Sequence, residues 1–131
     1  MMKIMVGYDG SNTSRDALNV ALKHAKAFGA TIHLVASMAR GTEDEQKQIK
    51  DFERDLEELK QEVDKASIPC ETHLLIRGLM PGEDLVSYAK ENGIGQIIMG
   101  IRRRSKVGKL LFGSTAQYVI LNAPCPVVTV R

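Results

Sequence analysis

The sequence contains no tryptophan, and only 5% of its residues are aromatic. Surfaces that bind single-stranded nucleic acid stack bases on aromatic rings between basic side chains, and this composition lacks that pattern. No apolar run approaches the roughly 20 residues of a membrane-spanning helix. The apolar start, residues 1–9, is too short for a signal peptide and is better explained as a first strand. The net charge is only +2, so no general attraction to nucleic acid or membrane is expected. We therefore expect a cytoplasmic protein.

Cysteine is also scarce. Cys70 and Cys125 lie far apart in the sequence and form no CxxC pair. In a cytosolic chain such cysteines are expected to be buried or half-buried thiols. His24, His33 and His73 fall on separate predicted elements without the spacing of metal ligands. We therefore predict neither a disulfide nor a metal site.

The sequence does contain a regular alternation of strand and helix patterns. Strands are predicted at residues 4–8, 31–36, 70–76, 96–99 and 127–130. Helices are predicted between them, and no linker or repeat interrupts the series, so residues 1–131 are treated as one domain. Strands that alternate with helices form a parallel sheet with helices on both faces and right-handed crossovers. The predicted fold class is therefore α/β.

The two longer predicted helices each have one apolar face. In the first, this face runs from Ala17 to Phe28 and stops before Gly29, a typical C-cap residue. The second helix, over about residues 43–65, has apolar side chains at intervals of three and four, namely Ile49, Phe52, Leu56, Leu59 and Val63. Two heptads are too few to indicate a coiled coil, so we predict a surface helix packed on the sheet.

The segment that follows the fourth predicted strand has the clearest functional pattern. It forms a glycine- and cation-rich loop and enters a helix at Gly113-Ser114-Thr115. A helix N-terminus offers unpaired N–H groups and a positive dipole end to an anion. Glycine lets the backbone approach a phosphate, and the two hydroxyls can donate hydrogen bonds to it. The same residues also make an ordinary helix cap, and this segment alone does not separate the two interpretations.

Several motifs stand at the ends of the predicted elements. They are Asp9-Gly10-Ser11, the strand ending Ile98-Met99-Gly100, Gly113-Ser114, and Ala123-Pro124-Cys125-Pro126. On these motifs the chain resembles the universal stress protein family from end to end. The nucleotide motif of that family is a glycine, two residues, a glycine, nine residues, and a glycine with Ser or Thr. Gly100, Gly113 and Ser114 match it, while Arg103 occupies the middle glycine position.

The resemblance implies an open five-stranded parallel sheet in the order 3-2-1-4-5, as in adenine-nucleotide alpha-hydrolase-like proteins. It also implies a nucleotide cleft where the first and fourth strands end, with Asp9 near ribose and adenine and Ala36 at the adenine wall. Asp9 has a second explanation, as a turn or helix-capping residue. The candidate nucleotide-binding residues are Gly7, Tyr8, Asp9, Ala36, Met99, Gly100, Arg102, Arg103, Gly113, Ser114, Thr115 and Ala116.

The loop between the fourth strand and the last helix carries five positive charges in eight residues, at Arg102, Arg103, Arg104, Lys106 and Lys109. These cations would neutralise a triphosphate or would simply be solvated. Nucleic-acid binding is a weaker alternative, because the cations lie in one short loop without aromatic residues. Arg103 itself either supplies a charged fork to phosphate or closes the cleft.

The resemblance implies a dimeric stress-response regulator that binds ATP or another adenine nucleotide, with Mg²⁺ accompanying a triphosphate. Its homodimer would form through Val127–Val130, an apolar edge strand that otherwise invites aggregation. Two alternatives remain, a nucleotide-free dimeric adaptor and a slow ATP hydrolase. The hydrolase lacks a convincing general base, because Asp9 is the only placed carboxylate and no histidine lies near the motif, so enzyme activity is not expected.

Overall fold

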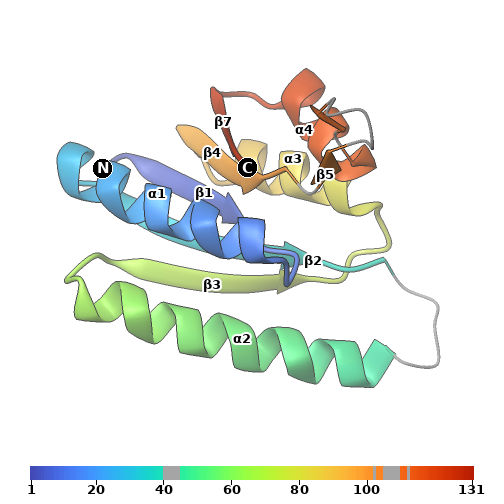
Figure 1. The fold of residues 1–131 in the computed structure, drawn as a ribbon, viewed down its shortest axis with the longest axis horizontal. Coiled ribbons are helices and arrows are strands. Elements are labelled where there is room, and N and C mark those ends of the chain that lie inside the picture. Colours follow the sequence, from blue (N-terminus) through green and yellow to red (C-terminus); the bar gives the residue numbers. More distant parts are fainter. Residues whose placement is uncertain (40–44, 102, 105–109, 112) are drawn as a thin grey trace.

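The computed structural model describes residues 1–39, 45–101, 103–104, 110–111 and 113–131 (Figure 1). Strands and helices alternate along the described chain as predicted. The elements are β1 Lys3–Gly7, α1 Asn12–Phe28, β2 Thr31–Ser37, α2 Glu45–Lys65, β3 Cys70–Leu75, α3 Pro81–Glu91, β4 Gln96–Gly100, β5 Arg103–Arg104, β6 Leu110–Leu111, α4 Ser114–Asn122 and β7 Val127–Val130.

The main sheet has five strands in the order β3-β2-β1-β4-β7, and every neighbouring pair is parallel. The predicted order 3-2-1-4-5 is therefore confirmed, with β7 as the fifth strand. The sequence predicted only a loop between the fourth strand and the last helix. That prediction was wrong for residues 103–104 and 110–111, which form the short antiparallel pair β5–β6.

Helix α1 begins and ends at the signals the sequence carries. The side chain of Ser11 caps it by accepting a hydrogen bond from the Ser14 backbone N–H at 3.2 Å. Gly29 ends it in the left-handed conformation, with φ of 65°. Phe28, the last residue of the predicted apolar face, is not buried. Its side chain is 56% exposed and lies beside the ring of His24, because the helix reaches past the edge of the core.

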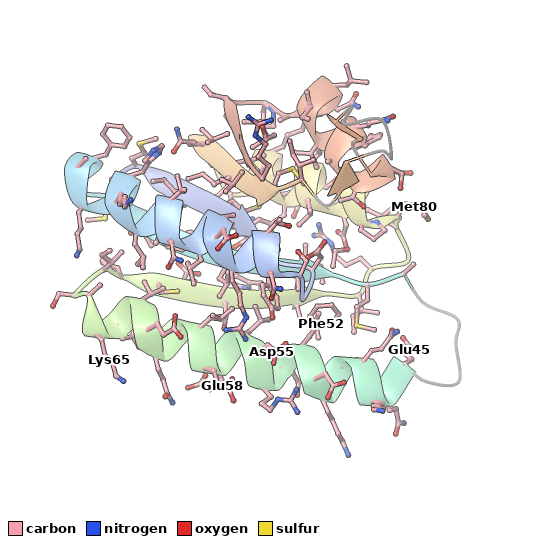
Figure 2. The ribbon with its side chains drawn as sticks, viewed as in Figure 1. Glu45, Phe52, Asp55, Glu58, Lys65 and Met80 are labelled. Carbon is pink, nitrogen blue, oxygen red and sulfur yellow. The ribbon has the colours of Figure 1, made fainter. Side chains whose placement is uncertain are left out.

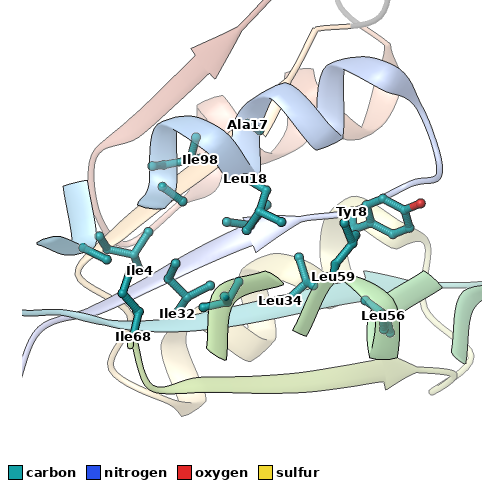
Figure 3. Packing of buried hydrophobic residues seen from close by; sticks show 14 of the residues in the cluster. Ile4, Tyr8, Ala17, Leu18, Ile32, Leu34, Leu56, Leu59, Ile68 and Ile98 are labelled. Carbon is teal, nitrogen blue, oxygen red and sulfur yellow. The ribbon is translucent and has the colours of Figure 1, made fainter. Parts of the chain in front are cut away.

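Two hydrophobic cores lie on opposite faces of the sheet. One is enclosed by α1 and α2, and the other by α3 and α4. Figure 3 shows the first, in which Ile4, Leu34 and Ile98 from the sheet meet Leu18 of α1 and Leu59 of α2. Burial of an aliphatic side chain of this size contributes about 1.5–3 kcal/mol. The helices are therefore held against both faces, which leaves the ends of the strands open.

The prediction that the second helix packs on the sheet is confirmed. Leu56, Leu59 and Val63 of α2 are buried, while Figure 2 shows Glu58 and Lys65 on its outer side. None of the described helices is long and apolar enough to cross a membrane. Cys70 and Cys125 are half-buried free thiols, as predicted.

Candidate functional site

A cleft of about 290 Å³ opens beyond the carboxyl ends of β1 and β4. Chain winding reverses there, because β1 continues to β2 on one side and pairs with β4 on the other. Such reversal points leave a crevice between loops that diverge to opposite faces of the sheet. The described residues that line the cleft are Gly7, Tyr8, Asp9, Ser14, Ser37, Phe52, Pro81, Leu85, Met99, Gly100, Gly113, Ser114, Thr115 and Ala116.

Most of the predicted site residues come together in this cleft. The structure places there Gly7, Tyr8, Asp9, Met99, Gly100, Gly113, Ser114, Thr115 and Ala116. Ala36 is instead fully buried in the core, and its neighbour Ser37 lines the cleft. Arg102 lies outside the described residues, and so does the side chain of Arg103.

Five lining residues were missed by sequence reasoning, namely Ser14, Ser37, Phe52, Pro81 and Leu85. Phe52 was assigned to the apolar face of its helix and does pack against the core. Pro81 occupies the start of α3, where its missing N–H costs nothing. Their place in the cleft depends on how α2 and α3 sit against the strand ends, for which local sequence carries no signal.

Gly113 has no structural reason to be glycine. Its φ of −65° and ψ of 164° are accessible to any residue. A Cβ built on it meets no heavy atom within 4 Å. Every other described glycine either has a positive φ or has a heavy atom within 4 Å of a built Cβ. The missing side chain therefore leaves bare backbone facing the cleft.

Helix α4 begins at this bare backbone. No side chain caps it, and the Gln117 N–H donates a backbone hydrogen bond to the Gly113 carbonyl at 3.0 Å. The N–H groups of the first helical turn precede that bond and have no partner within the helix. Together with the hydroxyls of Ser114 and Thr115, they form a surface that attracts anions at one wall of the cleft.

The opposite end of the cleft is acidic. A hollow of about 360 Å³ adjoins it, lined by Asp9, Asp51 and Asp55 and by no basic residue among those described. Arg54 forms ion pairs with Asp51 and Asp55 from the exposed side of α2. The Tyr8 hydroxyl donates to Asp55 Oδ2 at 2.9 Å. Burial, and then this hydrogen bond, raise the pKa of Tyr8. An anionic group in the cleft is therefore favoured at the α4 end.

Asp9 plays the local part that its sequence position also predicts. Its Oδ1 accepts the Ser11 backbone N–H at 2.9 Å, which closes the turn before α1. The residue is exposed and lines both the cleft and the adjoining hollow. The turn thus fixes the carboxylate at the junction between them.

The rim of the cleft is held by a buried ion pair. Asp84 of α3 is fully buried, and its Oδ1 lies 2.6 Å from both Nε and Nη2 of Arg77. Its Oδ2 accepts a hydrogen bond from the Ser37 hydroxyl at 3.1 Å. Arg77 also reaches Glu91 at the end of α3, at 2.9 Å. Through Ser37, which lines the cleft, these contacts connect the end of β2 to α3.

Comparison with known proteins agrees with this architecture. Residues 1–131 match the model of the universal stress protein family. The chain belongs to this family. It is 33% identical to a universal stress protein of Thermus aquaticus, over 98% of this chain and 97% of the relative.

Solved structures of family members extend the comparison. One universal stress protein from Archaeoglobus fulgidus superposes with a TM-score of 0.90 at 34% identity, covering 100% of this chain and 99% of that one. Another structure, of the universal stress protein from the same organism in complex with dAMP, has a TM-score of 0.83 at 32% identity and covers 100% and 98%. At least one universal stress protein with this fold therefore binds an adenine nucleotide.

Proposed function

We propose that the cleft binds an adenine nucleotide, with ATP and accompanying Mg²⁺ as the expected ligand, and that the chain acts as a dimeric stress-response regulator. The observation that carries this proposal is the bare backbone of Gly113 at the start of α4, in a cleft where the fold does not require glycine. The dAMP complex of the Archaeoglobus relative supports the adenine nucleotide as the ligand class.

The charges around the cleft orient the proposed ligand. Phosphates are attracted to the open N–H groups of α4 and repelled by Asp9, Asp51 and Asp55 at the other end. The nucleoside therefore lies toward Tyr8 and Phe52, where the lining is aromatic. In this orientation the Asp9 carboxylate accepts a hydrogen bond from a ribose hydroxyl.

Gly113→Val is expected to weaken Mg-ATP binding at least about tenfold, equivalent to about 1.4 kcal/mol. The branched side chain occupies the space through which phosphate approaches the α4 N–H groups. The free protein should remain folded, because a Cβ at this position meets nothing within 4 Å. Isothermal titration of wild type and variant with Mg-ATP measures the change.

Two comparisons make this titration specific. Asn122→Ala, at the other end of the same helix, should bind Mg-ATP like the wild type. Adenosine should bind wild type and Gly113→Val equally, because it lacks the phosphates that the substitution excludes. Equal Mg-ATP affinities of wild type and Gly113→Val would contradict the proposed phosphate position, and a wild type that binds no adenine nucleotide would leave the nucleotide-free adaptor as the function.

Binding rather than hydrolysis is proposed because the cleft offers little acid–base chemistry. Asp9 is the only carboxylate among the described lining residues, and no histidine is among them. The hydrogen bond from Ser11 N–H already engages the Asp9 carboxylate in a turn. The proposed regulator therefore acts by binding nucleotide, which changes the surface around α4, and not by hydrolysing it.

The proposed dimer forms through β7, the edge strand beside β4. The carbonyls of Pro126 and Val130 accept hydrogen bonds from Ile97 and Ile101, so these residues direct their backbone groups toward β4. Alternate residues of a parallel strand point the other way. Val127 and Thr129 therefore present their N–H and C=O groups outward, where a second β7 can pair with them.

Thr129→Pro is expected to convert the dimer into a monomer, since proline removes an outward N–H and leaves the hydrogen bonds to β4 in place. Size-exclusion chromatography with light scattering should show half the wild-type mass. Thr129→Val keeps the N–H and should stay dimeric. A wild type that is monomeric at all concentrations, or a dimeric Thr129→Pro, would refute pairing through this strand.

A further inference from the structure

A second cluster of chemically active side chains lies on strands β2 and β3. In the parallel register His33 is paired with Glu71, and Val35 with His73. Alternate residues of a strand share a face, so the two histidines and the glutamate project from the same face of the sheet. Tyr88 of α3 packs against both histidine rings. His33 and His73 lie on separate elements, as the sequence predicts, and the pairing of β2 with β3 brings their side chains together.

The donor atoms of these three side chains lie close together. His73 Nε2 lies 3.2 Å from Glu71 Oε1, and His33 Nε2 lies 3.6 Å from Glu71 Oε2. The two imidazole rings are stacked at an angle of 20°. One donor atom from each of the three residues lies within 4.8 Å of the others. Bonds of about 2.0–2.1 Å around a tetrahedral zinc ion separate its donors by about 3.3 Å, so modest side-chain rotation closes the difference.

His33 has an unusual environment. It is only 2% exposed, and its Nδ1 lies 2.7 Å from the Tyr88 hydroxyl. Its Nε2 is buried and is the one such side-chain atom of the described residues that lacks a hydrogen-bond partner. A buried polar atom without a partner is costly. When Nδ1–H donates to Tyr88, Nε2 carries a lone pair directed toward Glu71, which is the arrangement of a metal-binding histidine with an outer hydrogen-bond partner.

We propose that His33, Glu71 and His73 form a binding site for a divalent transition-metal ion such as Zn²⁺. His33 and His73 supply Nε2, Glu71 supplies a carboxylate oxygen, and water occupies the fourth position, a donor set that zinc accepts. The metal takes the place of the proton that His73 Nε2 shares with Glu71, and that proton is released. Tyr88 acts as a positioning residue that holds the ring of His33.

The protonation states of the cluster suit this ion. Burial lowers the pKa of His33, so its ring is neutral at neutral pH. The hydrogen bond to His73 lowers the pKa of Glu71, so its carboxyl group is anionic. Glu71 and His73 are 57% and 38% exposed, which gives an ion a route from solvent to the buried nitrogen. The free thiol of Cys70 is a poor competitor, because burial raises its pKa to about 11.

This site is separate from the nucleotide cleft. None of the three proposed ligands is among the described residues that line the cleft. His33 stands in register with Met5, two residues before the end of β1. The proposal therefore does not rest on nucleotide binding, and each can fail without the other.

The test is titration of untagged, chelator-treated protein with ZnCl₂ by calorimetry, together with Co²⁺ titration followed by visible absorption. The wild type is expected to bind one Zn²⁺ per chain and to give the intense visible bands of low-coordinate Co²⁺. Glu71→Gln alters an exposed side chain and His73→Gln a half-buried one at the edge strand β3, so both variants should keep the fold. Each should weaken Zn²⁺ binding by more than about 100-fold, since loss of an outer partner alone typically costs 10–100-fold.

Two further variants sharpen the result. Tyr88→Phe should weaken Zn²⁺ binding about tenfold and leave the stoichiometry at one, as expected of a positioning residue. His24 lies on α1, away from the cluster, and its ring is hydrogen-bonded to Gln96 of β4. The control variant His24→Gln should therefore bind Zn²⁺ like the wild type. Equal Zn²⁺ affinity of wild type and His73→Gln, or no visible Co²⁺ band, would overturn the proposal and leave a purely hydrogen-bonded cluster. Mg-ATP titration of the same variants should be unchanged.

Discussion

Arg77→Met is expected to lower the free energy of unfolding by about 3 kcal/mol. The substitution keeps an unbranched stem of similar length but removes the guanidinium beside Asp84, which has no exposed surface. A buried carboxylate without its cation keeps its full desolvation cost, which is why breaking a buried pair is more destabilising than the pair is stabilising. We place the effect at the low end of the usual range because Arg77 itself is 36% exposed.

Arg54→Met is the matched control for this substitution. Arg54 also pairs with two carboxylates, Asp51 and Asp55, but its side chain is 62% exposed and both distances are 3.5 Å. An exposed pair of this kind contributes about 0–1 kcal/mol. Urea denaturation of both variants measures the difference. Equal, small losses would mean that the Ser37 hydroxyl and solvent are sufficient to stabilise the Asp84 carboxylate.

The Arg77 variant should also affect the cleft. Asp84 joins the end of β2 to α3 through Ser37, a lining residue. When the pair is broken, Asp84 loses the cation that fixes its carboxylate beside Ser37. The ion pair therefore connects the stability of the fold to the geometry of the proposed nucleotide site.

Gly100→Ala is expected to destabilise the protein by about 2–3 kcal/mol, through overpacking rather than through backbone strain. A Cβ on Gly100 would lie 2.6 Å from both the backbone carbon and the Oγ1 of Thr13. Backbone atoms cannot rotate away, so the start of α1 would have to move off the end of β4. The glycine of the proposed nucleotide motif thus has a structural explanation at this position, in contrast to Gly113.

Gly7→Ala provides the comparison, because Gly7 ends the adjacent strand β1 and also lines the cleft. Its Cβ would meet Leu85 Cδ1 at 3.6 Å and Met99 Cβ at 3.8 Å, which are ordinary contacts. We expect a change below about 1 kcal/mol for Gly7→Ala. Thermal and urea unfolding of the two variants test the difference. Similar stabilities would show that the start of α1 yields easily, and the close-packing argument would then fail.

The alternation of short apolar runs and amphipathic helices was enough to predict the fold class, because only a parallel sheet with helices on both faces buries both patterns. The cleft where the first and fourth strands end was predicted by the family resemblance and not by this alternation. The resemblance carried by Asp9, Gly100 and Gly113 then supplied the strand order, which periodicity does not contain.

Local pattern was less informative where packing geometry decides the outcome. Phe28 fits the apolar period of α1 but lies beyond the core and is exposed. Ala36 matches a predicted adenine wall, yet it lies within the fully buried part of β2, and Ser37 at the end of the strand lines the cleft. Periodicity specifies a face of an element and not how far the neighbouring layer extends along that face.

By itself, the sequence determined the order and type of the main elements, the end of α1 at Gly29 and the start of the last helix at Gly113-Ser114. These features depend on the backbone preferences of single residues and on the period of a few neighbours. Only the tertiary structure decided that Asp84 is buried against Arg77, that Phe52 reaches the cleft, and that His33, Glu71 and His73 share one face. Such proximities arise from strand register and helix docking between segments far apart in the chain, where contact distances are set by packing of the whole core and not by local preference.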